Sequence, residues 1–137
     1  MKSKLALVLA GATSLLAAKA ALAHHSFAAE FNADMPVNLS GHVTKIEWMN
    51  PHTMFYLDVE KEDGSYENWA IELGSPNGLM RRGWTRNSLS IGDEVTVTGS
   101  QARDGGQKAN ARTVTLSDGK RMFAGSSQPD VEDGSTN

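Results

Sequence analysis

Alternation of apolar and polar residues is clearest near the middle of the chain, at residues 54–59. Such a period of two is expected for a strand with one buried face and one solvent face. The apolar positions there are Phe55, Leu57 and Val59. Pro51 interrupts the run before it, because proline lacks an N–H and disfavours helical geometry in the preceding residue. The pattern predicts a strand, a corner and a second strand over residues 46–59, with His52 at the edge of the corner.

The strand that leads into this corner changes phase. Val37 and Leu39 place the apolar set at odd positions, whereas Ile46 and Trp48 place it at even positions. One strand cannot keep both sets on the same face unless it contains a bulge or a sharp bend. Gly41 is a residue type that permits a bend, so we expect the irregularity near it.

Similar patterns predict the strands, turns and helix of the remaining chain up to residue 123. Ser75 and Pro76 are typical of a helix start, since serine accepts a bond from a free N–H and proline suits the first turn. Glycine-containing polar turns separate the strands. The predicted elements are a turn at 61–65, a strand with Trp69, Ile71 and Leu73 inward, a helix at 76–82, strands at 94–99 and 108–116, and a short strand at 121–123.

This order predicts a mainly β fold, namely a five-stranded OB-like antiparallel barrel with one short helix between strands 3 and 4. Closure would hide the edges of such short strands. An open five-stranded sheet covered by the helix is the alternative. We expect an N-terminal arm at 24–36, the barrel domain at 37–124, and a disordered tail at 125–137, where Val131 is the one strongly apolar residue.

The first 23 residues have the features of a secretory signal peptide. Lys2 and Lys4 precede an apolar stretch, and small residues stand at the positions that a signal peptidase reads. We therefore expect residues 1–23 to be removed by cleavage after Ala23 and the mature chain to be periplasmic or secreted. No later segment is long and apolar enough to be expected to span a membrane.

Charge and cysteine content narrow the function classes. The predicted cleavage removes three lysines and no acidic residue, so the formal net charge falls from −3 to about −6. Nucleic-acid binders need the opposite sign, so we expect no nucleic-acid partner. The chain has no cysteine, which excludes disulfides, thiolate metal sites and cysteine nucleophiles.

Five short motifs are spread along the predicted mature chain. They are His-His-Ser-Phe at 24–27, Trp-x-Asn-Pro-His at 48–52, Gly-Ser-Pro-Asn-x-Leu-x-Arg-x-Gly-Trp at 74–84, Gly-Asp-x-Val-x-Val-x-Gly at 92–99 and Ala-x-x-Val-x-Leu-x-Asp-Gly at 111–119. With these motifs the chain resembles a family of small exported bacterial proteins with a domain of unknown function. The resemblance covers nearly all of the mature chain up to about Ser126, with Met49 departing towards an apolar residue. It implies an exported location and an OB-like barrel, and no established activity.

The histidines suggest a metal site. After cleavage, His24 would carry a free α-amine and an imidazole that can chelate one ion together. A further imidazole would complete a T-shaped nitrogen set that suits copper, a histidine brace. His52 on the proline-containing corner is the best placed partner, with His25 as helper, whereas His42 is expected on an exposed strand. The competing interpretation is that His52 only hydrogen-bonds its own turn.

A ligand site without metal is the second hypothesis. In OB-type barrels, the first strand-to-strand loop and the loop into the helix border one binding face. The candidate ligand-binding residues are Asn50, Pro51, Ser75, Asn77, Trp48 and Trp84. Ser75 also suits a helix cap, and the tryptophans also suit a small core.

No catalytic set emerges from the sequence. Glu47, Asp58 and Glu72 are strand carboxylates without an acid–base spacing, and Ser26 has no orienting acid. We therefore expect a binding module rather than an enzyme, with copper as the cofactor or, alternatively, an envelope protein or small ligand as a metal-independent partner. An oxidoreductase built on the copper site is a third class, for which no substrate cleft is visible.

Overall fold

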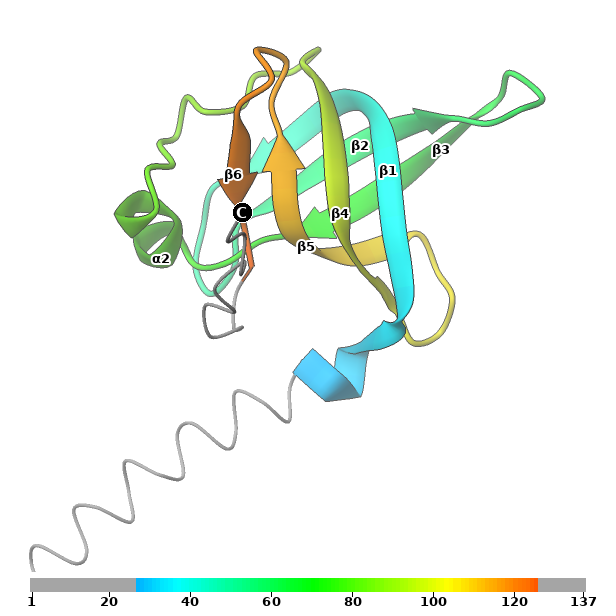
Figure 1. Cartoon of the computed structure of the whole chain (residues 1–137), viewed down its shortest axis with the longest axis horizontal. Coiled ribbons are helices and arrows are strands. Elements are labelled where there is room, and N and C mark those ends of the chain that lie inside the picture. Colours follow the sequence, from blue (N-terminus) through cyan, green and yellow to red (C-terminus); the bar gives the residue numbers. More distant parts are fainter. Residues whose placement is uncertain (1–26, 126–137) are drawn as a thin grey trace, which may run out of the picture. The chain divides into compact units, whose positions relative to one another are not determined.

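The computed structural model describes residues 27–125. Contacts divide the chain into two units, 1–30 and 31–137, and the second holds the sheet. A helical turn occupies residues 27–30. The other elements are β1 (Phe31–Glu47), β2 (Met54–Glu60), β3 (Tyr66–Glu72), α2 (Pro76–Arg81), β4 (Glu94–Ala102), β5 (Lys108–Thr115) and β6 (Arg121–Phe123) (Figure 1). The predicted signal peptide and nearly all of the predicted tail lie outside the described residues.

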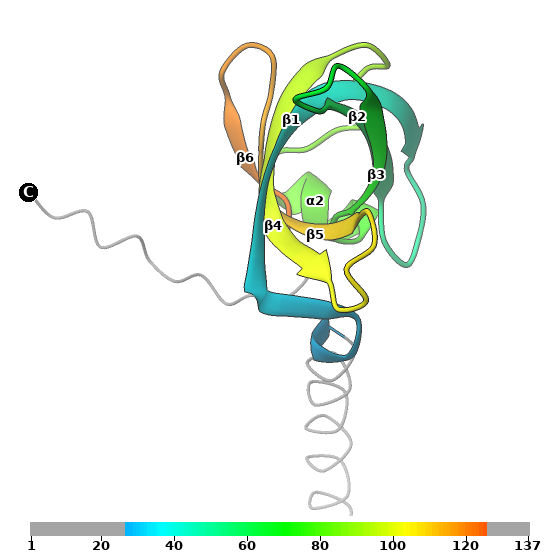
Figure 2. The same ribbon diagram turned by 90° about the vertical axis from the view of Figure 1, so that its right-hand side faces the viewer.

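The strands form one six-stranded sheet in the order β3-β2-β1-β4-β5-β6, and β3 also pairs with β5. That extra pairing closes a ring through five strands, seen end-on in Figure 2. The mainly β prediction is confirmed. The predicted short strand at 121–123 is confirmed as β6, which extends the sheet beyond the five strands of the ring. The departure from the predicted antiparallel barrel is the β3–β5 pair, which is parallel and joins Ala70 to Lys108 and Glu72 to Asn110.

Strand β1 is long and irregular, as its phase change predicts. The register with β2 shifts between Val43 and Lys45, so Thr44 is the extra residue and the inward face changes parity there. Gly41 lies three residues earlier, where a Cβ atom would collide with the backbone carbonyl of Asp58. Glycine is therefore needed at that close approach, while the bulge itself lies at Thr44.

Strand β1 also begins earlier than expected. It starts at Phe31, which pairs with Ala102 of β4, and Pro36 pairs with Ser100 further along. The last part of the predicted N-terminal arm is therefore strand. The register of β1 with β4 shifts between Phe31 and Pro36.

The core fills the interior of the ring. The prediction that Leu57, Trp69 and Ile71 face inward is confirmed, because all three are buried, and Val97 of β4 is buried with them. Helix α2 lies at one end of the ring (Figures 1 and 2), and its Leu79 joins the core cluster. Polar side chains of β3 and β5, among them Glu72, Lys108 and Asn110, lie on the outward face of the ring. This face carries the candidate site.

Candidate functional site at the β1–β2 corner

The corner between β1 and β2, residues 48–53, is fastened to the end of β3. The Thr53 N–H donates to the Gly74 carbonyl at 3.0 Å, and the Leu73 N–H donates to the Thr53 carbonyl at 2.9 Å. The Asn50–Pro51 peptide bond is cis. The two backbone hydrogen bonds of Thr53 hold its neighbour His52 next to the end of β3.

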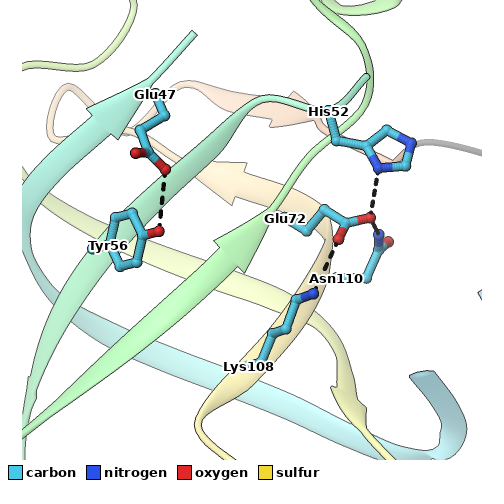
Figure 3. Close-up of polar contacts among 6 residues, drawn as sticks. All are labelled: Glu47, His52, Tyr56, Glu72, Lys108 and Asn110. Atoms are coloured by element: carbon cyan, nitrogen blue, oxygen red, sulfur yellow. Dashed lines mark hydrogen bonds and ion pairs between the residues drawn. The ribbon is translucent and has the colours of Figure 1, made fainter. Parts of the chain in front are cut away.

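His52 is oriented by a carboxylate. Its Nδ1 lies 2.9 Å from Oε1 of Glu72, and its side chain is 40% exposed. An ionised Glu72 can accept hydrogen bonds but cannot donate them, so Nδ1 of His52 carries the proton. A neutral His52 then keeps its lone pair on Nε2. Figure 3 shows this second ring nitrogen on the side of the imidazole away from Glu72. The arrangement fixes the tautomer and leaves one ring nitrogen free to bind a ligand.

Glu72 is the centre of a polar cluster that also contains His52, Lys108 and Asn110. Its side chain is only 9% exposed, and its Oε2 lies 3.5 Å from Lys108 Nζ. Asn110 Nδ2 donates to Oε1 at 3.4 Å (Figure 3). A carboxylate so far removed from water needs charged or hydrogen-bonding partners. The parallel pairing of β3 with β5 supplies Lys108 and Asn110, and the corner supplies His52.

A second polar cluster lies on β1 and β2. Lys45 Nζ is 2.6 Å from Glu47 Oε1, and the Tyr56 hydroxyl donates to Glu47 Oε2 at 3.1 Å (Figure 3). The hydrogen bond with Lys45, followed by that from Tyr56, lowers the pKa of Glu47. The same bond with Glu47 raises the pKa of Lys45. The charged groups of this cluster contact one another, and none of its side chains presents a free ring nitrogen as His52 does.

The six residues predicted to bind a ligand do not share one surface. Asn50, Pro51 and Asn77 are exposed. The Ser75 hydroxyl accepts from the Gly78 N–H at 3.2 Å, so it caps α2. Trp48 is partly buried and packs against the core cluster.

Trp84 is the clearest departure from the expected binding face. It is 2% exposed, and its Nε1–H donates to the Phe123 carbonyl at 2.8 Å. Its indole is therefore a core element that joins the segment after α2 to β6, and it cannot present a ring to a surface ligand.

The predicted metal ligands divide between described and undescribed parts of the chain. His24 and His25 lie outside residues 27–125. Within that range, no group of three or more His, Cys, Asp or Glu side chains is placed to hold a metal ion. His42 is exposed on β1, opposite Asp58 of β2 and Glu94 of β4. The described part of the chain therefore offers His52 as an oriented imidazole.

Sequence reasoning did not assign Glu72 a role. Its position between the inward residues Ile71 and Leu73 places it on the outward face, which suggests exposure. The burial of Glu72 comes from strand β5, which lies alongside only because the ring closes there.

No helix in residues 27–125 has both the length and the apolar character needed to cross a membrane.

Comparison with known proteins assigns the chain to a family. No curated protein matches it. A family model matches residues 13–111, a range that includes the corner, Glu72, Lys108 and Asn110. That match covers more than half of the chain and agrees with the resemblance to a domain of unknown function. The chain belongs to the family of unknown function DUF6152.

Proposed function

We propose that this protein is an exported OB-like barrel module that binds copper through His24 and His52. The observation that carries the proposal is the 2.9 Å contact between His52 Nδ1 and the nearly buried carboxylate of Glu72. Histidines that ligate metals commonly donate the other ring N–H to a carboxylate, which fixes the tautomer and raises the basicity of the ligating nitrogen. His52 has this arrangement, with Nε2 left to bind.

His24 supplies the other ligands in this proposal. Cleavage after Ala23 frees its α-amine, which together with its imidazole can chelate one ion. Imidazole nitrogens suit copper, and Cu(II) is the tightest binder among the first-row divalent ions for a given nitrogen site. His25 assists as an additional imidazole. The OB-like assignment is supported by the ring of five strands and by α2 at one of its ends.

The mature terminus provides the direct test. Protein recovered from the periplasm of a bacterial host should have His24 as its first residue by mass spectrometry. Its Cu(II) affinity, measured by competition with a chelator, should exceed that of a chain with one extra N-terminal residue, because the amide so formed is no longer an amine ligand. His52→Ala should weaken binding by at least about 10 to 100-fold, the range seen for outer-shell changes.

His42→Ala is the matched control. His42 is an exposed histidine of β1, so its loss removes one imidazole without touching the corner. Affinity should remain within about twofold of the unchanged protein, well inside the effect expected at a ligand. Equal affinity for the native terminus, the extended terminus and His52→Ala would overturn the copper proposal.

A metal-independent interaction module is the competing proposal. Asn50 and Pro51 are exposed beside His52, so the corner can present a surface to an envelope protein or a small ligand. The corner would then act through shape and backbone groups, and copper would bind no more tightly than it does to a flexible di-histidine peptide. The same affinity series separates the two proposals.

A further inference from the structure

Arg82 is held beside the end of β6 by two contacts. Its Nη1–H donates to the Gly125 carbonyl at 2.7 Å, and its guanidinium carbon lies 4.5 Å from the centroid of the Phe123 ring. The residue is nevertheless exposed, and a guanidinium has further N–H donors beyond the one used here. Arg82 is therefore a fixed cation that still has donors available at the surface.

A second arginine lies on the same side of β6. Side chains alternate between the two faces of a strand, and the buried Met122 separates Arg121 from Phe123. Arg121 and Phe123 therefore share the outward face, with their Cα atoms about 7 Å apart, the length of two residues of strand. The exposed Arg121 is thus a near neighbour of the ring on which Arg82 lies.

A third arginine comes from β5. The Ala124 N–H donates to the Arg112 carbonyl at 2.8 Å, which places Arg112 directly across from the end of β6. The register of β5 with β4 shifts at this point, so no β4 residue is paired with Arg112. A bulge of this kind re-aims a side chain. The residues on either side of Arg112 are buried, whereas Arg112 itself is exposed.

These three residues, Arg82, Arg112 and Arg121, are called the arginine cluster. Within residues 27–125, none of the ion pairs involves a guanidinium group of the cluster. Acidic residues gather instead at the β2–β3 hairpin, where residues 58–67 include five acidic residues and one basic residue. Figure 1 shows the turn of this hairpin projecting away from β6. An anion placed among the three cations would lower their mutual repulsion.

We propose that the arginine cluster binds a phosphate group. A phosphate monoester carries about −1.5 to −2 charges and three strong acceptor oxygens, and the guanidinium fork matches its geometry. A carboxylate has one charge and fewer oxygens, so it would use fewer of the available donors. The site contains none of the residues of the proposed copper site and does not rest on that proposal. The phosphate group can belong to a free ion or to a lipid headgroup.

A titration with inorganic phosphate tests the free ion. In ¹H–¹⁵N NMR spectra, the Nε–H signals of the cluster should shift together and reach saturation. The double variant Arg112→Gln/Arg121→Gln leaves both contacts of Arg82 intact. It should lower phosphate affinity by about twentyfold, taking about fivefold for each cation.

Arg103→Gln is the matched control. Arg103 is an exposed arginine in the turn between β4 and β5, and that turn precedes the end of β5 that is remote from β6. Its replacement removes the same charge from the protein without changing the cluster. Phosphate affinity should stay within about twofold of the unchanged protein.

Vesicles test the lipid headgroup. The protein should sediment with vesicles that contain phosphatidylglycerol and not with vesicles of phosphatidylcholine alone, because a net negative surface attracts basic residues. The double variant should lose this sedimentation, and Arg103→Gln should keep it. Binding to phosphate alone would support the inference with a free ion as ligand, and binding to vesicles alone would support it with a lipid headgroup as ligand.

Two results would overturn the inference. The first is the absence of binding in both assays, or binding that the double variant and Arg103→Gln change equally. The second concerns the acidic residues that follow Gly125 in the sequence, Asp130, Glu132 and Asp133. If their replacement by Asn, Gln and Asn moved the Nε–H signals of the cluster without phosphate, the chain's own carboxylates would be the occupant and the phosphate site would be wrong.

Discussion

The two connections on either side of β2 are held in different ways. The turn at residues 61–65 is stabilised by its own atoms: the Lys61 N–H donates to the Ser65 carbonyl at 2.8 Å, and the Gly64 N–H donates to the Lys61 carbonyl at 2.9 Å. The corner at residues 48–53 is instead held by the segment after β3, through Thr53, Leu73 and Gly74. One connection is held by its own residues, and the other is held by the segment that follows β3.

The difference extends to the side chains. Asp63 accepts from the backbone and hydroxyl of Ser65, two residues away. His52 contacts Glu72, and Glu72 contacts Lys108 and Asn110 from a strand much later in the chain. The corner at 48–53 has contacts from several strands, which can orient one of its side chains towards solvent. The turn at 61–65 is stabilised by its own residues and reverses the chain direction.

Removal of Glu72 should produce the largest effect. Glu72→Ala deletes the acceptor of His52 and the partner of Lys108, so we expect about 1–3 kcal/mol loss in the free energy of unfolding, measured by urea denaturation. Copper affinity should fall by about 10 to 100-fold, because the imidazole is no longer oriented.

Glu72→Gln sharpens this prediction. The amide oxygen still accepts from His52 Nδ1–H but carries no charge, so copper affinity should recover in part. Asp63→Ala is the control from the self-contained turn and should leave copper affinity unchanged. Copper affinity in Glu72→Ala within about twofold of the unchanged protein would contradict an orienting role for this carboxylate.

A change at Gly64 should have an intermediate effect and should be confined to stability. Its φ is 79°, in the left-handed region that disfavours side chains. Gly64→Ala should therefore cost about 1–2 kcal/mol in the free energy of unfolding. Copper affinity should not change, because no corner residue takes part in this turn. A parallel loss of copper affinity would show that the two connections are coupled.

Local features of the sequence predict local structure well. The turn at 61–65, the helix capped by Ser75 and the phase change of β1 all follow from residues that lie close together in the chain. The parallel β3–β5 pairing does not, because its partners are far apart and alternation specifies only which face of a strand is buried. The environment of Glu72 depends on that pairing and was therefore missed.

Trp84 shows a second limit of sequence patterns. It precedes a connector without alternation, so no periodicity assigns its ring to the core or the surface. Its burial depends on the Phe123 carbonyl of β6, which accepts the indole N–H. The sequence predicts His52 as a site residue from its position on the corner, which is a local feature. Glu72, the residue that orients it, can be identified only from the three-dimensional structure.

The smallest effect concerns the acid stability of the self-contained turn. The hydrogen bond from the Ser65 hydroxyl, followed by that from the Ser65 backbone, lowers the pKa of Asp63 below its ordinary value of 3.8. A carboxyl whose pKa is lower in the folded state contributes stability above the unfolded pKa, and this contribution is lost as pH falls through the folded pKa. The turn should therefore loosen only in strong acid.

Ser65→Ala tests this cause directly. It removes the hydroxyl donor and keeps the backbone donor, so the pKa of Asp63 should rise towards 3.8 without reaching it. The measurement is an NMR titration of the Asp63 carboxyl in both proteins, with Glu47 as internal reference, because its lowered pKa depends on Lys45 and Tyr56 and should stay the same. An unchanged Asp63 titration would show that the backbone bond alone sets its pKa. A shift of Glu47 as well would mean that the turn is not self-contained and that the contrast with the corner is one of degree.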